Sequence, residues 1–225
     1  MTTSHHHPGD ESGIPPTEGL WSEAFWDQRY RSSSAIWSGH PNPQLRAEAG
    51  GLSPGEALDA GCGEGADAIW LAERGWRVDA LDISTIALER GAAHAAILSG
   101  DVAARITWKQ VDLLTWMPRA RTYDLVSAQF MQLPVEQRTA LFEHLAAAVR
   151  SGGTLLLFGH SPADLNTTAR RPRLPELFFT AEQVAAALDP LQWMIIVSEA
   201  RPREARDPSG DPVTVHDEVV RAQRI

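Results

Sequence analysis

The stretch Ala57-Leu58-Asp59-Ala60-Gly61-Cys62-Gly63-Glu64-Gly65-Ala66 decides the fold of this 225-residue chain. A short apolar run ends at Asp59, a glycine-rich turn follows, and a helical pattern begins at Ala66. Backbone without side chains can approach a ligand closely, and the positive end of a helix faces that ligand. The stretch therefore predicts a strand, a ligand-binding turn and a helix in succession.

Short apolar runs alternate with longer amphipathic stretches beyond this turn. The strand-like runs are 57–59, 77–81, 106–110, 123–127 and 154–158, and helical spacing covers 66–74, 84–98 and 134–150. Such alternation predicts parallel strands joined by right-handed crossovers, with helices on both faces of the sheet. Two last β-rich segments, 193–199 and 213–220, are separated by a Pro-rich gap without a helix, so we expect an antiparallel hairpin. The predicted fold class is α/β, a Rossmann-like doubly wound seven-stranded sheet that is mostly parallel.

We expect a single domain over residues 19–225. Residues 1–18 are polar and lack apolar periodicity, which predicts a disordered tail. The His5-His6-His7 run in this tail has no accompanying metal ligands. Apolar residues at helical spacing follow in 21–30, and a short helix is expected over 44–49. We therefore divide the domain into an N-terminal helical lid, 19–53, and a Rossmann-like core, 54–225.

Composition and charge narrow the function classes. The chain has 29 acidic and 20 basic residues, a formal charge of −9 and no basic tract, which disfavours nucleic acids and acidic membranes as partners. One cysteine excludes an internal disulfide framework and a structural zinc cluster. No apolar run approaches the ~18–20 residues of a membrane span, and the polar N-terminus does not read as a secretory signal. We expect a cytoplasmic protein that uses no metal; its oligomeric state stays open.

A nucleoside is the ligand that the glycine turn and the next strand suggest. Asp82 ends the second strand-like run, where an acid can accept hydrogen bonds from both ribose hydroxyls. Gly61, Gly63 and Ala66 also satisfy a dinucleotide-binding spacing. Asp59, however, can reach an ammonium group, whereas it would repel a pyrophosphate. These features favour S-adenosylmethionine over NAD, and Asp112 is positioned to accept a hydrogen bond from an adenine amino group.

From about residue 25 to 224 the chain resembles the class I S-adenosylmethionine-dependent methyltransferases. It is closer to their small-molecule branch, which includes tellurite-resistance and thiopurine-type enzymes. The segments that carry the resemblance are FWDQRY (25–30), IWSGHPNPQL (36–45), ALDAGCGEGADAIWLAERGWRVDALDIS (57–84), VDLLTW (111–116), YDLVSAQFMQLP (123–134) and GGTLLLFGH (152–160).

The resemblance implies S-adenosylmethionine as cofactor and S-adenosylhomocysteine as product. It places the methionine end of the cofactor on Asp59, Gly61, Cys62, Gly63 and Gly65. Asp82 would hold the ribose and Ile83 would pack on the adenine. Asp112 and Leu113 would meet the adenine edge, and Gln129 would lie beside the methionine moiety.

Methyl transfer from a sulfonium is an in-line displacement that needs chiefly proximity and orientation. We expect a small-molecule acceptor, with a thiol or another soft nucleophile among the candidates. His160 at the end of the fifth strand is the candidate base, and the segment 161–175 with its arginines is either a solvated face or attractive to an anionic acceptor. Two alternatives remain open, an NAD(P)-dependent oxidoreductase and a non-catalytic nucleoside-binding module. The candidates for the substrate pocket are Trp26, Tyr30, Trp37 and His40.

Overall fold

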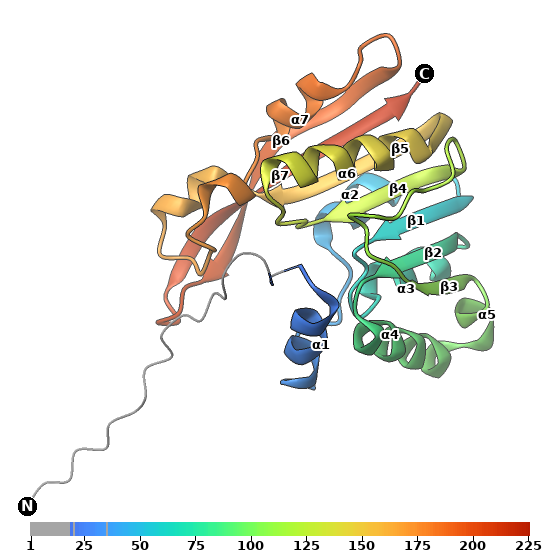
Figure 1. Ribbon diagram of the computed structural model, residues 1–225, viewed down its shortest axis with the longest axis horizontal. Coiled ribbons are helices and arrows are strands. Elements are labelled where there is room, and N and C mark those ends of the chain that lie inside the picture. Colours follow the sequence, from blue (N-terminus) through green and yellow to red (C-terminus); the bar gives the residue numbers. More distant parts are fainter. Residues whose placement is uncertain (1–18, 20, 35) are drawn as a thin grey trace, which may run out of the picture.

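The computed structural model describes residues 19, 21–34 and 36–225, and the predicted tail over 1–18 lies outside the described residues (Figure 1). Its centre is a seven-stranded sheet with the order β3-β2-β1-β4-β5-β7-β6. The strands are β1 (Glu56–Ala60), β2 (Arg77–Asp82), β3 (Ile106–Gln110), β4 (Tyr123–Gln129), β5 (Val149–His160), β6 (Trp193–Arg206) and β7 (Pro212–Arg224). The predicted fold class is confirmed.

Strand direction fixes where a ligand can bind. The pairs β1–β2, β2–β3, β1–β4 and β4–β5 are parallel, whereas β7 runs antiparallel to both β5 and β6. After β1 the chain moves outward to β2 and β3, and it then returns to place β4 on the other side of β1. Such a reversal opens a crevice at the carboxyl ends of the strands. The glycine turn that follows β1 lies at this crevice.

Helices cover both faces of the sheet, and their ends follow local capping signals. The α-helices are α1 (Glu23–Arg31), α2 (Pro43–Ala49), α3 (Ala66–Glu73), α4 (Thr85–Leu98), α5 (Gly100–Ala103), α6 (Val135–Ala148) and α7 (Ala181–Ala187); the 3₁₀ segments are η2 (Pro162–Asn166) and η3 (Pro175–Leu177). Ser84 caps α4 through its hydroxyl, and a capping box of Thr180 and Gln183 opens α7 with both of its hydrogen bonds. Among the described residues, no helix has the length and apolarity to cross a membrane.

The hydrophobic core is divided by the sheet into two clusters. On one face, α6 and α7 pack on the sheet through Leu141, Leu145 and Ala181. On the other face, α2 and α3 contribute Leu45 and Leu71, and Figure 1 shows these helices behind the sheet. Trp70, Trp76 and Trp193 are buried, and Trp108 packs against the second cluster. Cys62 of the glycine turn packs against the second cluster, so the core supports the turn.

The terminal hairpin is longer than the sequence predicts. We expected strands over 193–199 and 213–220 with a proline-containing connection, but β6 continues through Pro202 to Arg206 and the turn spans only 207–211. Proline removes a backbone donor, which an edge strand tolerates because one of its sides has no neighbour. Since β6 is the last strand of the sheet, Pro202 fits within it. The short elements α5, η2 and η3 were also not predicted.

Candidate functional site

The glycine turn adopts a backbone that only glycine takes up readily. Gly61, Gly63 and Gly65 have φ values of +74°, +53° and +80°. The N–H groups of Gly61 and Cys62 both donate to the carbonyl oxygen of Leu81, at 2.8 and 2.9 Å. These bonds hold the turn after β1 against the end of β2. The glycine turn and Asp82, which are both predicted to bind the cofactor, therefore lie side by side.

Side chains from two other segments lie directly on the turn. A Cβ atom at Gly63 would lie 3.0 Å from the hydroxyl of Tyr30 and 3.2 Å from Nε1 of Trp37. A Cβ atom at Gly61 would lie 2.8 Å from the sulfur of Met131. The N-terminal segment and the loop after β4 thus both reach the turn, and Met131 is a contact that sequence reasoning missed.

Asp59 is a buried carboxylate at the carboxyl end of β1. Its Oδ2 atom has no hydrogen-bond partner among the described residues. Burial raises the pKa of Asp59 well above its usual range, and the neighbouring carboxylates of Asp67 and Asp82 raise it further. An oxygen in this setting suits a cationic hydrogen-bond donor, so the residues present fit the ammonium group of the predicted cofactor.

Asp67 is the second carboxylate of this cluster and was not among the predicted site residues. It accepts hydrogen bonds from the backbone N–H of Asn42 at 2.6 Å and from Nε2 of Gln129 at 2.5 Å. Burial raises the pKa of Asp67 to about 6. The sequence signal that could have identified Asp67 is its place in the first turn of α3, beside the glycine turn. An acid there is also an ordinary feature of a helix start, so the signal is not specific.

Asp82 completes the cluster at the end of β2. Its two carboxylate oxygens accept hydrogen bonds from the N–H of Gly63 at 2.8 Å and from the N–H of Ser84 at 2.9 Å. Burial raises the pKa of Asp82 despite these bonds. Asp82 therefore fixes the middle of the glycine turn relative to the start of α4, at the position predicted for the ribose.

The positions predicted to meet the adenine follow β2 and β3. Ile83 is partly buried, Leu113 is buried and Asp112 is exposed. Asp112 accepts a hydrogen bond from the N–H of Leu114 at 2.9 Å, which shapes the loop after β3. Because β2 and β3 are neighbours in the sheet, these three positions lie at one edge of the crevice.

Glu64 clamps the N-terminal segment onto the turn. Its Oε2 atom accepts from the N–H groups of Ile36 and Trp37, at 3.2 and 3.4 Å, and its Oε1 atom pairs with Arg90 at 2.9 Å. Arg90 also donates to the carbonyl oxygen of Tyr30 at 2.8 Å. The residue between the second and third glycines is therefore a structural anchor that the glycine pattern did not single out.

The predicted substrate-pocket residues differ in their surroundings. Tyr30 is buried and accepts a hydrogen bond from Nε1 of Trp37 at 3.0 Å. The ring of Trp26 lies 6.1 Å from that of Tyr30, and the guanidinium of Arg29 lies over both Trp26 and Trp37. His40 is exposed and contributes only a backbone hydrogen bond, to Ser38. The structure brings together the first three of these residues but not His40.

A buried contact also fixes α1 over the start of α4. The hydroxyl of Ser84 donates to Asp27 at 2.6 Å, and Asp27 pairs with Arg31 at 3.0 Å. Asp27 was missed because its position in α1 reads as an ordinary polar helix residue. The contact places α1 beside the same end of β2 that carries Asp82.

His160 lies at the carboxyl end of β5, as predicted. Its ring packs against Phe130 with centroids 4.5 Å apart, and its Nδ1 atom is buried without a hydrogen-bond partner among the described residues. Burial, together with the positive charges of Arg171 and Arg203, lowers the pKa of His160 to about 3. The imidazole is therefore neutral near pH 7 and a weak base. Phe130 has a φ of +52°, a strained value for an aromatic residue.

The Cys62 thiol is held in its neutral form. Burial raises its pKa well above the usual range, and the carboxylates of Asp59 and Asp82 raise it further. A thiol without access to the thiolate form is a small packing residue rather than a nucleophile. Among the described residues, no three His, Cys, Asp or Glu side chains are grouped so as to hold a metal ion.

Known proteins share both the sequence and the fold of this chain. Residues 57–153 match a family described as a methyltransferase domain. A probable thiol methyltransferase 2 of Arabidopsis thaliana is 32% identical over 108 residues, which are 47% of this chain and 46% of that protein. A 2-heptyl-1-hydroxyquinolin-4(1H)-one methyltransferase of Mycobacteroides abscessus is 28% identical over 164 residues, 67% of this chain and 71% of that protein.

The similarity covers unequal shares of these proteins. The chain spans less than half the length of the first curated relatives that it matches, the Arabidopsis protein and a ribosomal RNA small subunit methyltransferase C of Alcanivorax borkumensis, of which it covers 28%. Among solved structures, the N-methyltransferase NodS of Bradyrhizobium japonicum in complex with S-adenosylhomocysteine has a TM-score of 0.65 at 18% identity, covering 88% of this chain and 95% of NodS. Residues 57–153 thus match a methyltransferase domain, and the sheet order and glycine turn of the chain resemble those of the class I S-adenosylmethionine-dependent methyltransferases.

Proposed function

We propose that the chain transfers the methyl group of S-adenosylmethionine to a small-molecule acceptor, and that thiols or other soft nucleophiles are the leading acceptor class. The observation that carries the proposal is the unpartnered Oδ2 atom of Asp59 beneath the glycine turn. The carboxylates of Asp67 and Asp82 lie close enough to add to the raised pKa of Asp59, so a cation is favoured there. The same negative cluster disfavours a pyrophosphate, which weighs against the NAD(P)-dependent alternative.

Each predicted cofactor contact has a specific task in this proposal. Asp59 accepts a hydrogen bond from the ammonium group, and Asp82 accepts from the ribose hydroxyls with the lone pairs that Gly63 and Ser84 leave free. Ile83, Asp112 and Leu113 contact the adenine. Gly61, Cys62, Gly63 and Gly65 admit the methionine end, and Gln129 lies beside it.

When bound, S-adenosylmethionine supplies an electrophilic methyl group on a sulfonium. The protein then contributes orientation, which can lower a barrier by ~7–11 kcal/mol when two reactants are held in line. Trp26, Tyr30 and Trp37 supply aromatic surface that attracts the sulfonium, an effect worth about 0.5–2 kcal/mol. His40 stays a predicted pocket residue, but the structure does not bring it together with the other three.

The state of His160 favours acceptors that need little help with deprotonation. A general base works best when its pKa lies near the working pH, and the pKa of His160 lies near 3. A thiol that ionises in solution, or another soft anion, does not require a strong base from the protein. The names of a thiol methyltransferase and a hydroxyquinolone methyltransferase among the relatives support small acceptors of this kind.

Calorimetry with S-adenosylhomocysteine tests the cofactor assignment. We expect binding to the wild type and a loss of more than about tenfold in affinity for Asp82→Ala, since a buried hydrogen-bonded carboxylate is removed from the ribose position. Asp101→Ala, an exposed acid in α5, is the matched control and keeps wild-type affinity. No binding by the wild type, or equal binding by Asp82→Ala, contradicts the proposal.

Turnover with a panel of thiols, phenols and amines tests the acceptor class. Release of S-adenosylhomocysteine is measured for each acceptor, and thiols are expected to react fastest. A parallel titration with NADH, followed by tryptophan fluorescence, is expected to show no saturable change. Cofactor binding without turnover of any acceptor favours the non-catalytic module instead. A cytoplasmic location and the division into a lid (19–53) and a core (54–225) remain part of the proposal.

A further inference from the structure

A hollow of about 240 Å³ lies against the segment that follows β5, and residues 164–175 line it, including Arg171 and Arg173. The chain enters this segment directly from His160, whose ring packs against Phe130. Phe130 follows Gln129, which contacts Asp67 beside the glycine turn. Two side-chain contacts and the course of the chain therefore lead from the proposed cofactor site to the segment that lines the hollow.

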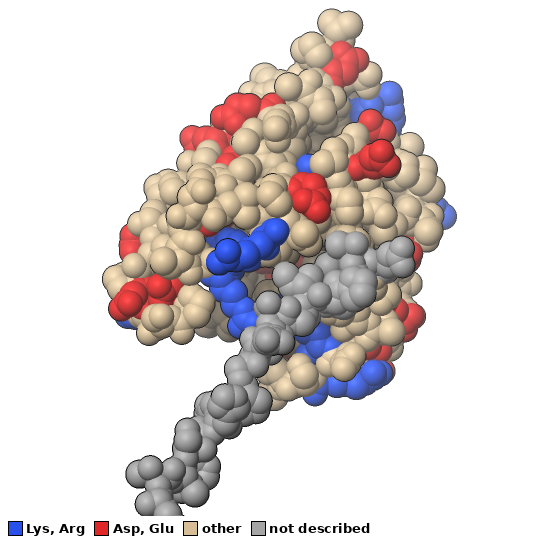
Figure 2. All heavy atoms as spheres, turned by 60° about the vertical axis from the view of Figure 1, so that its left-hand side comes forward, with Lys and Arg blue, Asp and Glu red and all other residues tan. Residues whose placement is uncertain are grey.

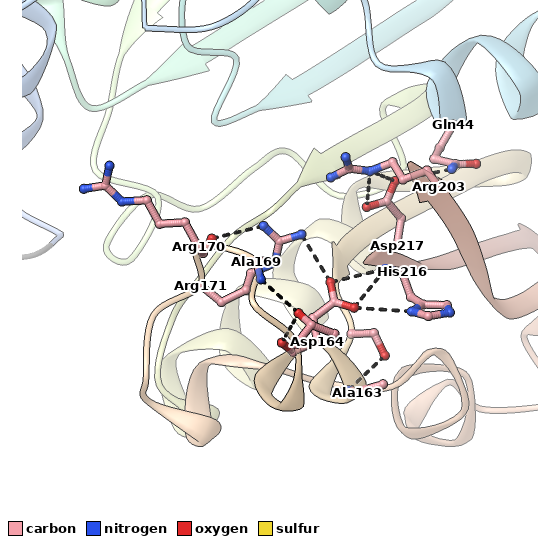
Figure 3. A network of polar contacts seen from close by, with 11 residues as sticks. Gln44, Ala163, Asp164, Ala169, Arg170, Arg171, Arg203, His216 and Asp217 are labelled. Carbon is pink, nitrogen blue, oxygen red and sulfur yellow. Dashed lines mark hydrogen bonds and ion pairs between the residues drawn. The ribbon is translucent and has the colours of Figure 1, made fainter. Parts of the chain in front are cut away.

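Asp164 builds one wall of the hollow. It is fully buried and accepts hydrogen bonds from the N–H of His216 at 3.0 Å and from a terminal nitrogen of Arg171 at 3.2 Å. Figure 3 shows Arg171 and His216 pointing toward Asp164 from the loop and from β7. The Nε atom of Arg171 is buried and has no hydrogen-bond partner among the described residues. One donor of a fixed guanidinium is thus left without an acceptor.

Two of the arginines in and next to this segment have no acidic partner among the described residues. Asp164 pairs with Arg171, and Asp217 pairs with Arg203, whose Nε atom lies 3.0 Å from both carboxylate oxygens. Arg170 and Arg173 are exposed, and no described residue forms an ion pair with either guanidinium. Figure 3 shows the Arg170 side chain extending away from the Asp164 network.

The positive charge of Arg170 and Arg173 contrasts with the charge of the whole chain. Figure 2 shows one group of basic atoms near the centre of the view and further basic and acidic atoms toward its edges. The whole chain, by contrast, has a formal charge of −9. The net charge of the chain repels a small anion at a distance, so only contacts at short range with the arginines can hold it.

We propose that the hollow beside Arg171 and Arg173 holds the negatively charged group of the methyl acceptor, so that the acceptor is a small organic acid such as an aromatic carboxylate. The inference rests on the proposed methyl transfer. A guanidinium presents its donors in a plane that matches a carboxylate, and Arg173 has no competing partner among the described residues. The rings of Phe130 and His160 pack together at the carboxyl ends of β4 and β5, where the segment that lines the hollow begins.

A matched pair of probes tests the charge preference. 4-Mercaptobenzoate and the neutral 4-mercaptobenzamide are titrated by calorimetry into protein saturated with S-adenosylhomocysteine. We expect the carboxylate to bind at least about tenfold more tightly than the amide, because one charge-assisted hydrogen bond contributes about that much affinity. Raising the salt concentration is expected to reduce this preference.

Substitutions of Arg173 test whether the preference for the carboxylate arises in this hollow. Arg173→Gln is expected to remove most of the preference for the carboxylate while leaving the binding of the amide unchanged, and Arg173→Lys is expected to restore part of it. Arg119→Gln is the matched control. Arg119 is exposed and lies near Tyr123 at the start of β4, whereas Phe130 follows the other end of that strand. A role of Arg173 in folding alone would weaken both probes equally.

The possible results separate this inference from the function on which it rests. If the wild type does not bind S-adenosylhomocysteine, the proposed methyl transfer fails. If that binding is intact and the carboxylate binds no better than the amide, or neither binds, the acid subsite is wrong. A preference that survives in Arg173→Gln overturns the assignment to this hollow.

Discussion

Gln129 donates a hydrogen bond from Nε2 to Oδ2 of Asp67 across 62 residues of sequence, with a distance of 2.5 Å. The bond joins the end of β4 to the first turn of α3, on either side of the point where the strand order reverses. The other oxygen of Asp67 accepts from the N–H of Asn42, which precedes α2. One carboxylate therefore connects three chain segments around the glycine turn.

Asp67→Asn is expected to stabilise the protein near pH 7.5. The pKa of Asp67 is about 6, above the ~3.9 of an unfolded aspartate, so the folded state binds this proton more tightly and loses stability as pH rises between these values. Asparagine does not ionise, so the variant does not lose this stability at higher pH. The amide of Gln129 can rotate so that its oxygen accepts a hydrogen bond from the new asparagine. We expect the free energy of unfolding at pH 7.5, measured with urea, to be about 1–2 kcal/mol higher for the variant than for the wild type.

The pH dependence distinguishes this cause from general packing. At pH 4 the wild-type carboxyl is protonated in the folded protein, so the advantage of Asp67→Asn is expected to shrink toward zero. Asp101→Asn, at an exposed position of α5, is expected to change stability at neither pH. An equal gain at both pH values contradicts the assignment of the shift to Asp67.

Gly65→Ala is expected to destabilise the protein more than Gly210→Ala. Both glycines have positive φ, +80° and +90°. A Cβ atom at Gly65 would collide with the ring of Trp108, whereas nothing lies within 4 Å of a Cβ atom at Gly210. The backbone strain costs about 1–2 kcal/mol at each position, and the collision adds to it only at Gly65.

Thermal unfolding of the two alanine variants measures this difference. Trp108→Leu in the background of Gly65→Ala is expected to recover part of the loss by making room, although it also removes buried surface. In the background of Gly210→Ala the same substitution is expected to recover nothing. Equal melting temperatures for the two alanine variants would show that the contact with Trp108 is unimportant.

The sequence predicts the elements whose determinants are local. The capping box at Thr180 and the helix start after Ser84 depend on residues three positions apart, and both are present. The course of β6 through Pro202 depends on its edge position, which pairing with β7 determines. No local pattern contains that information.

The same distinction applies to the candidate site. The glycine turn and Asp82 could be recognised because their spacing lies within one strand-turn-helix-strand unit. The contact between Gln129 and Asp67, and the hydrogen bond from Ser84 to Asp27, join residues 57 or more positions apart. They follow from the sheet order and the position of α1, which sequence patterns describe only coarsely.

Glu64→Ala is expected to release the segment around Trp37 from the glycine turn. The substitution removes the acceptor of two backbone N–H groups and the partner of Arg90. Hydrogen exchange at the amides of Ile36 and Trp37 is expected to accelerate by about tenfold or more, since two buried or partly buried bonds are lost. Glu136→Ala, at an exposed position in α6, is the control and leaves these rates unchanged.

His160 is expected not to titrate between pH 5 and 8 in the folded protein, because its pKa is lowered to about 3. An unfolded histidine binds its proton near pH 6.5, so the folded state binds fewer protons between these values and gains stability as pH rises through them. The NMR shift of the His160 ring proton, assigned by comparison with His160→Gln, measures the titration directly. If methyl transfer showed an inflection near pH 6.5 that disappeared in His160→Gln, the imidazole would be working as a general base and its burial against Phe130 would not govern its protonation.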